Sequence, residues 1–326
     1  MWLETLAILG GIAVLVWGAD RFVTGAAALA RNLGVSTLII GLTVVGLGTS
    51  APEILVSAMA SLEGNTGLAI GNAVGSNIAN IGLILGATAL LVPLTVRSGT
   101  LRREYPLVLA VSFLAFALLW NQRLEQLDGI ILLACLVAIT LWMIHIARQG
   151  TDGDPLQDDL EAEIPRDMNT GRAVFWLLIG LLALLASSRL LVWGAVEIAT
   201  ALGISDLIIG LTIVAIGTSL PELAASVTGA LKGEDDLAIG NVLGSNLYNL
   251  LAVLSLPGLI APGPVSEAVL QRDLPLMLIL TIAIFFMSHG RFSPRNRINR
   301  LEGALLLLCF AGYQFWLYHS ATAAIA

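Results

Sequence analysis

The sequence predicts an all-α membrane protein of ten transmembrane helices, arranged as two inverted five-helix repeats. Three observations support this prediction: the composition, a duplicated segment and the distribution of basic residues. The 326 residues are 57% hydrophobic and 12% charged, with a mean hydropathy of +0.89, whereas soluble domains carry about 25% charged residues. Apolar runs of about 20 residues recur along the chain, and runs of that length are typical of transmembrane helices.

The duplicated segment comprises residues 36–80 and 205–249. At a fixed offset of 169 residues and without a gap, 25 of the 45 aligned positions are identical. A match this dense indicates an internal duplication. The chain is therefore divided into a first repeat (1–150), an acidic linker (151–170) and a second repeat (171–326).

Apolar runs bounded by charged or turn residues predict five helices in each repeat. The predicted helices are 3–29, 35–61, 66–92, 105–120 and 127–147, followed by 173–199, 205–231, 236–256, 273–289 and 302–319. Because the number of spans in a repeat is odd, the second copy enters the membrane in the opposite orientation. This is the inverted-repeat plan of many transporters.

The basic residues agree with this count. If both termini lie outside and the linker lies in the cytoplasm, twelve Lys and Arg residues fall in inside loops, and only Arg123 and Arg272 fall outside. This asymmetry follows the positive-inside rule and predicts a multi-pass protein of the cell (cytoplasmic) membrane. The linker carries seven acidic residues without the spacing of a calcium loop, so we interpret it as a solvated connection.

A first polar motif interrupts the apolar pattern in each copy. It reads Gly-Thr-Ser-x-Pro-Glu at 48–53 and again at 217–222. Proline kinks a helix and frees the carbonyl four residues earlier, here near Gly48 and Gly217. In a bilayer, a free carbonyl is tolerated only where protein, water or an ion satisfies it. The motif therefore predicts two helix breaks lined with oxygen atoms.

Each motif contains one glutamate, Glu53 or Glu222, and the only basic residues within predicted spans, Arg21 and Arg189, lie outside the duplicated segment. An ionised acid at mid-bilayer costs about 2.5–3.5 kcal/mol on insertion scales, so each carboxylate is expected to bind a cation or a proton. Hard cations such as Ca²⁺ select oxygen ligands, whereas zinc, copper and iron favour His or Cys. Within the predicted spans, Arg21 and Arg189 are expected to snorkel or to pair with nearby acids.

A second motif, Gly-Asn-x-x-Gly-Ser-Asn-x-x-Asn, spans 71–80 and 240–249. Its two glycines form a small-xxx-small pair, which lets helices approach closely. Its serine and last asparagine lie four residues apart on one helical face and can present oxygen to a single point. These pairs are Ser76 with Asn80 and Ser245 with Asn249. For Ser57 and Ser226 we expect interhelical hydrogen bonds instead.

Together, these paired motifs closely resemble the two α-repeats of the calcium/cation antiporter superfamily, in its sodium/calcium exchanger branch. The resemblance covers both repeats and the ten-helix layout. It implies an antiporter that exchanges Ca²⁺ for Na⁺ by alternating access, with no enzymatic activity and no cofactor. The alternative is a Ca²⁺/H⁺ or other divalent cation exchanger, although the Asn-Ala-x-Glu-type motif of proton exchangers is absent. An intramembrane hydrolase or a passive channel fits the duplicated acids less well.

The resemblance also implies a ligand set at mid-membrane. Both glutamates would bind Ca²⁺ and share in Na⁺ binding. The two threonines would give backbone oxygen to Ca²⁺ and, with the four serines, oxygens for Na⁺. The glycine and alanine carbonyls would also bind Na⁺, and the two asparagines would line the centre. The implied ligands are Glu53, Glu222, Thr49, Thr218, Ser50, Ser219, Ser76, Ser245, Asn80 and Asn249, with the carbonyls of Gly46 and Ala215. We expect protons to compete, and no nucleic acid or obligatory protein partner beyond the lipid bilayer.

One position departs from the family pattern. Many relatives have aspartate where this chain has Asn249, so this chain retains two carboxylates in the implied site. A less negative centre favours K⁺-independent exchange.

Overall fold

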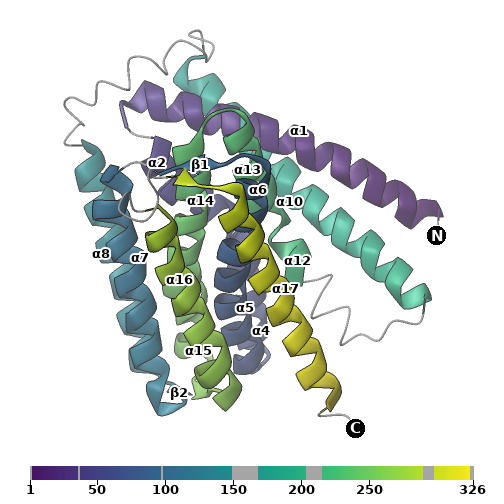
Figure 1. The fold of residues 1–326 in the computed structure, drawn as a ribbon, viewed down its shortest axis with the longest axis vertical. Helices are drawn as coiled ribbons and strands as arrows, with labels where there is room; N and C mark the ends of the chain where they lie inside the picture. Colours follow the sequence, from purple (N-terminus) through teal and green to yellow (C-terminus); the bar gives the residue numbers. More distant parts are fainter. Residues whose placement is uncertain are drawn as a thin grey trace.

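The computed structural model describes residues 2–35, 37–96, 98–148, 168–202, 215–288 and 297–323. It is a bundle of helices in which α1 and α10 lie side by side and slant across the others (Figure 1). The first half contains α1 (Trp2–Leu33), α2 (Thr37–Ile40), η1 (Gly41–Val45), α3 (Gly46–Thr49), α4 (Ala51–Leu62), α5 (Thr66–Ala79), η2 (Asn80–Leu85), α6 (Gly86–Leu91), β1 (Leu94–Thr95), α7 (Ser98–Leu118), η3 (Leu119–Asn121), β2 (Arg123–Leu124) and α8 (Gln126–Arg148). The second half contains α10 (Thr170–Ala201), α12 (Ala215–Thr218), α13 (Leu220–Leu231), α14 (Asp235–Tyr248), η5 (Asn249–Val253), α15 (Ser255–Ile260), β3 (Gly263–Pro264), η6 (Val269–Asp273), α16 (Leu274–Ser288), β4 (Arg297–Ile298) and α17 (Arg300–Ala323). Of the segments labelled η, η3 is a 3-10 helix and the others are π-helical.

The described helices confirm the predicted helical membrane fold. Seven are long and apolar enough to cross a bilayer, or eight if the bent pair formed by Gly41–Thr49 and Ala51–Leu62 is one span. A shorter apolar helix, Tyr105–Asn121, lies where the fourth span is predicted. The span predicted at 205–231 is described only from Ala215 onward, and most of the acidic linker also falls outside the described residues.

Two short antiparallel ladders join the repeats. Strand β1 pairs with β4, and β2 pairs with β3. Strands β1 and β3 occupy equivalent positions of the two repeats, 169 residues apart, yet their ladders lie at opposite ends of the bundle (Figure 1). The equivalent helices α4 and α13 also lie toward opposite ends. Both placements are those that an inverted repeat produces.

Helix α14 runs through the middle of the bundle and packs closely on η1 and α3. A Cβ added at Gly244 would lie 2.5 Å from the Leu42 carbonyl oxygen, and one added at Gly41 would lie 3.1 Å from the Cα of Gly240. The close approach predicted for the small-xxx-small pair of Gly240 and Gly244 is therefore confirmed. At the equivalent Gly71 and Gly75, a Cβ would meet no described neighbour within 4 Å.

Glycines also bring the two slanting helices together. A Cβ at Gly25 of α1 would lie 2.5 Å from the backbone nitrogen of Leu177 in α10. In return, a Cβ at Gly180 would collide with the backbone of Phe22. Because backbone meets backbone at both points, α1 and α10 form one closely packed pair.

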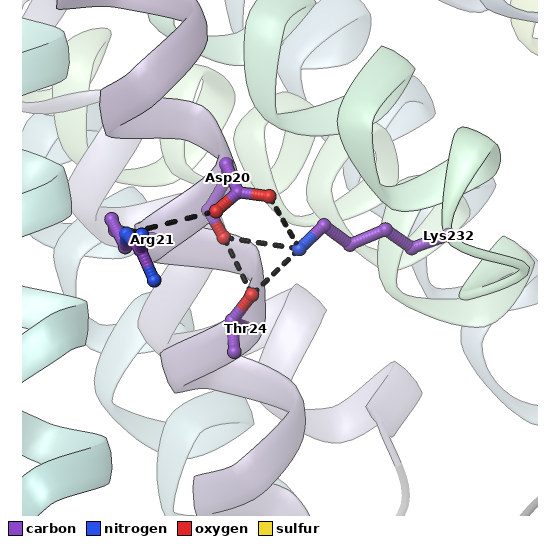
Figure 2. Close-up of polar contacts among 4 residues, drawn as sticks. All are labelled: Asp20, Arg21, Thr24 and Lys232. Atoms are coloured by element: carbon purple, nitrogen blue, oxygen red, sulfur yellow. Dashed lines mark hydrogen bonds and ion pairs between the residues drawn. The ribbon is translucent and has the colours of Figure 1, made fainter. Parts of the chain in front are cut away.

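Polar contacts tie this pair to α13 (Figure 2). The Lys232 ammonium lies 2.7 Å from Asp20 Oδ1 and donates a 2.6 Å hydrogen bond to Thr24 Oγ1, both on α1. Arg21 Nε lies 3.7 Å from Asp20 Oδ2, which confirms the expectation that Arg21 pairs with a nearby acid. Arg189 is exposed on the surface of α10.

Candidate cation-binding site

The two helix breaks have nearly the same geometry. Ser50 separates α3 from α4 with φ −79° and ψ 6°, and Ser219 separates α12 from α13 with φ −89° and ψ 5°. In the first half the axes on either side of the break differ by 51°. A proline in the first turn of α4 and of α13 has no N–H to donate to the preceding turn, so the kink follows from the sequence.

Each break places its glutamate in the interior, in the first turn of the following helix. Glu53 is 1% exposed and Glu222 is 2% exposed. Ser50 Oγ donates a 3.4 Å hydrogen bond across to Glu222 Oε1, and the two carboxyl groups are close enough to interact electrostatically. In the part of the chain that the structure describes, neither carboxylate is paired with Lys or Arg. The breaks of the two repeats therefore face each other and bring two buried acids together.

Several predicted ligands carry a buried oxygen that has no hydrogen-bond partner among the described residues. These atoms are Glu53 Oε2, Glu222 Oε2, Ser219 Oγ and Asn249 Oδ1. An unsatisfied buried polar group costs about 1–3 kcal/mol, more if it is charged. Unpaired oxygens from both repeats are what a bound hard cation would satisfy, so the residues present fit a cation cargo.

The remaining side chains predicted as ligands in the first half are also buried. Thr49 Oγ1 lies 3.5 Å from Ser245 Oγ, and Asn80 Nδ2 donates a 3.0 Å hydrogen bond to Asn246 Oδ1. Ser76 is 8% exposed. The structure thus brings polar residues of α3 and η2 against those of α14.

The predicted ligands Gly46, Ala215 and Thr218 lie in the short helices directly before the two breaks. Gly46 begins α3, and its backbone lies against that of Gly244 and Ser245, about 3 Å from where a Cβ would stand. Ala215 and Thr218 bound the short helix α12 directly before the second break. All twelve predicted positions are thus described, Ala215 by its backbone alone.

A feature that sequence reasoning missed is the π-helical turn at each central asparagine. Turn η2 begins at Asn80 and η5 begins at Asn249, which are equivalent positions in the two repeats. Single π-helical turns inside α-helices are frequent at functional sites because they redirect side chains and loosen the regular hydrogen-bond ladder.

The freed carbonyl at the second break is satisfied by protein. Ser188 Oγ of α10 donates a 2.7 Å hydrogen bond to the carbonyl oxygen of Gly217. Nothing in the apolar sequence around Ser188 singles it out. By contrast, the interhelical bonds expected of Ser57 and Ser226 are present: Ser57 Oγ donates to the Val253 carbonyl, and Ser226 Oγ accepts from Asn241 Nδ2.

Within the described ranges, no group of three or more His, Cys, Asp or Glu side chains gathers around a point. The site is instead built from two carboxylates with hydroxyl, amide and carbonyl oxygens. Buried oxygen atoms at facing helix breaks, within repeats of opposite orientation, are typical of a membrane ion transporter.

Comparisons with known proteins agree with this class. The family model described as sodium/calcium exchanger protein matches residues 3–145 and 172–319. The chain therefore belongs to the sodium/calcium exchanger protein family, whose members are membrane antiporters and not enzymes.

Individual relatives match over nearly their whole length. A putative antiporter, CaxA of Alkalimonas amylolytica, is 50% identical over 320 residues, which are 98% of this chain and 100% of that protein. The sodium/calcium exchanger MaX1 of Methanosarcina acetivorans is 32% identical, with 96% of this chain and 98% of that protein covered. A solved structure of the sodium-calcium exchanger NCX_Mj, soaked with Na⁺ and Ca²⁺, has a TM-score of 0.80 and 32% identity over 95% of this chain and 96% of its own.

Proposed function

We propose that this chain exchanges Ca²⁺ for Na⁺ across the cytoplasmic membrane by alternating access, without a requirement for K⁺. The observation that carries the proposal is the pair of buried carboxylates, Glu53 and Glu222, whose Oε2 atoms have no hydrogen-bond partner among the described residues. The proposed ligands are the twelve residues predicted from the repeated motifs.

Charge balance supports this choice of ions. Two carboxylates neutralise one Ca²⁺, and the same oxygens serve Na⁺ when Ca²⁺ is absent. Because both loads use Glu53 and Glu222, each ion displaces the other, as obligatory exchange requires. An empty site would retain two unneutralised acids in a low-dielectric interior, which raises the free energy of moving the empty carrier.

The neutral central pair supports independence from K⁺. Asn80 and Asn249 supply amide oxygen but no charge, so the site has no third carboxylate to balance an additional monovalent ion. The names of MaX1 and NCX_Mj support the Na⁺/Ca²⁺ assignment, since both are called sodium/calcium exchangers. The name of CaxA specifies an antiporter without its ions.

The proposal includes an orientation. The termini lie outside and the linker lies in the cytoplasm, as the distribution of basic residues favours. In this arrangement Lys232 lies at the cytoplasmic end of α13. The closely packed pair of α1 and α10 is proposed to slide past the remaining helices to expose the site to either side.

Ion flux in proteoliposomes tests the function. Purified protein is reconstituted, and uptake of radiolabelled Ca²⁺ is measured under outward gradients of Na⁺, K⁺ or H⁺, with protein-free liposomes as the control. We expect uptake that follows the Na⁺ gradient and does not change with K⁺. Uptake that follows a proton gradient and ignores Na⁺ would establish the alternative, a Ca²⁺/H⁺ exchanger.

A further inference from the structure

The first asparagine of the second motif has no role among the ligands above, yet it makes the same contact in both repeats. Asn72 Nδ2 donates a 3.0 Å hydrogen bond to the backbone carbonyl of Glu53, and Asn241 Nδ2 donates a 3.1 Å bond to that of Glu222. The two asparagines are 169 residues apart, as are the glutamates. In each repeat, the helix with the asparagine (α5 or α14) is therefore hydrogen-bonded to the first turn of the helix with the glutamate (α4 or α13).

The contacts of Asn241 extend further. Its Nδ2 also donates to Ser226 Oγ at 2.9 Å, and its Oδ1 accepts a 3.0 Å hydrogen bond from Thr49 Oγ1 of the other repeat. Asn241 is 1% exposed. Since its two N–H groups and its carbonyl oxygen are all engaged, the amide has a fixed orientation, with Oδ1 directed at Thr49.

This orientation matters because a hydroxyl group has one proton. When Thr49 gives that proton to Asn241, its oxygen presents only lone pairs to its remaining surroundings. A cation binds lone pairs and is repelled by the O–H dipole, so the acceptor prepares Thr49 as an ion ligand. Other acceptors within reach of Thr49 Oγ1 include the carbonyls of Val45 at 3.1 Å and Gly46 at 3.4 Å, the Ser245 hydroxyl at 3.5 Å and the Glu222 carboxylate. Without Asn241, the proton turns to one of these acceptors.

We propose that Asn241 is a positioning residue that couples the Thr49 hydroxyl of one repeat to the Glu222 backbone of the other, and so sets the preference for Na⁺ over Ca²⁺. Na⁺ depends more on neutral oxygens than Ca²⁺ does, because Ca²⁺ gains more from the two carboxylates. Loss of the coupling should therefore weaken Na⁺ binding more than Ca²⁺ binding. Asn72 holds Glu53 but, among the residues that the structure describes, makes no hydrogen bond to a hydroxyl ligand, so its loss should affect both ions to a similar degree.

The inference rests on the proposed function, and equilibrium binding separates the two. Calcium binding to the purified full-length protein is measured by titration calorimetry, and the Na⁺ concentration that displaces half of the bound Ca²⁺ is then determined. For Asn241→Ala we expect the Na⁺ requirement to rise about tenfold, the effect of about one hydrogen bond. The Ca²⁺ dissociation constant should change by less than about threefold.

Matched variants make the test specific. Asn65→Ala removes an exposed asparagine at the N-terminus of α5, the first-repeat equivalent of α14. This variant should bind both ions like the native protein. Thr49→Val should reproduce the loss of Na⁺ binding, and Thr49→Ser, which restores a hydroxyl, should bind Na⁺ more tightly than Thr49→Val. The double variant Thr49→Val/Asn241→Ala should be no weaker than Thr49→Val alone. Asn72→Ala should leave the ratio of the two affinities unchanged.

Three results would overturn the inference: native Na⁺ displacement in Asn241→Ala, independent effects in the double variant, or native Na⁺ displacement in Thr49→Val. The last decides the question even if Asn241→Ala does not fold. Native protein that binds neither Ca²⁺ nor Na⁺ would instead refute the exchanger proposal itself.

Discussion

Lys232 Nζ lies 2.7 Å from Asp20 Oδ1 and so joins the end of the helix that carries Glu222 to the middle of α1 (Figure 2). Asp20 lies within a predicted membrane span. On insertion scales an unpaired acid costs about 2.5–3.5 kcal/mol at the centre of a span. A long lysine side chain that reaches it from the helix end lowers that cost.

Replacing Lys232 with Met should destabilise the protein because, within the described ranges, the Asp20 carboxylate then keeps only its 3.7 Å contact with Arg21. We expect the thermal unfolding midpoint in detergent to fall in Lys232→Met and to recover in part in the double variant Asp20→Asn/Lys232→Met, which has no uncompensated acid. The exchange rate should rise by about twofold to fivefold because the tie that restrains α1 is lost, equivalent to up to about 1 kcal/mol. A native midpoint in Lys232→Met, or a double variant less stable than it, would contradict this account.

The carboxylates give the most direct prediction. Glu53→Gln and Glu222→Gln each remove one of the two charges that balance Ca²⁺, so each should lower Ca²⁺ transport by about a hundredfold or more, as loss of a buried charge–ion contact implies. Uptake of radiolabelled Ca²⁺ is measured at equal amounts of reconstituted protein. Glu63→Gln, an exposed acid at the end of α4, serves as the control and should transport normally. Normal Ca²⁺ uptake in either buried variant would refute the site.

Because the segment is duplicated, the two buried acids and the two helix breaks of the candidate site could be predicted from the sequence. The same polar residues occur twice within apolar surroundings, and a proline in each copy fixes the helix break. The contact from Ser188 was not predictable, because its neighbour Ser187 has the same composition around it and the equivalent position in the first repeat is Ala19. Which of the two adjacent serines faces the Gly217 carbonyl depends on how α10 packs. The hydrophobic period of an apolar helix does not encode that packing.

The π-helical turns and the two-residue ladders escaped prediction for a related reason. A π-helical turn adds one residue to a helix that is apolar on most sides, so the pattern of η2 and η5 does not shift visibly. Ladders of two residues are shorter than any alternation that distinguishes a strand. Helix positions, by contrast, were set by the length of apolar run that a bilayer requires.

Asn249→Asp tests the neutral centre. The change adds a third carboxylate near an oxygen, Asn249 Oδ1, that has no partner among the described residues. We expect stronger proton competition, seen as a rise in the pH at which Ca²⁺ uptake is half-inhibited, or a new dependence on K⁺. Uptake is measured across a pH series with and without K⁺. An unchanged profile in both respects would refute the role assigned to this position.

Gly244→Ala tests the close packing of α14 on η1. The added Cβ would lie 2.5 Å from the Leu42 carbonyl oxygen and 2.8 Å from its Cα, both backbone atoms that cannot rotate away. Overpacking of this kind costs about 1–3 kcal/mol, so we expect a lower thermal midpoint and reduced exchange. Gly10→Ala, where an added Cβ meets nothing within 4 Å, is the control. A Gly244→Ala protein with native stability would show that the two helices separate easily.

Ser188→Ala tests the bond between α10 and the second helix break. The substitution fits the available space but leaves the Gly217 carbonyl without its 2.7 Å donor, at a cost of about 1–3 kcal/mol. We expect the thermal midpoint to fall by a few degrees, since 1 kcal/mol corresponds to roughly 1–2 °C for a chain of this size. Ser187→Ala is the matched control, since Ser187 is also buried but, among the described residues, its hydroxyl bonds only to the Leu184 carbonyl of its own helix. If both variants unfold at the same temperature, the carbonyl freed by the proline is satisfied in another way, and the bond from α10 does not stabilise the break.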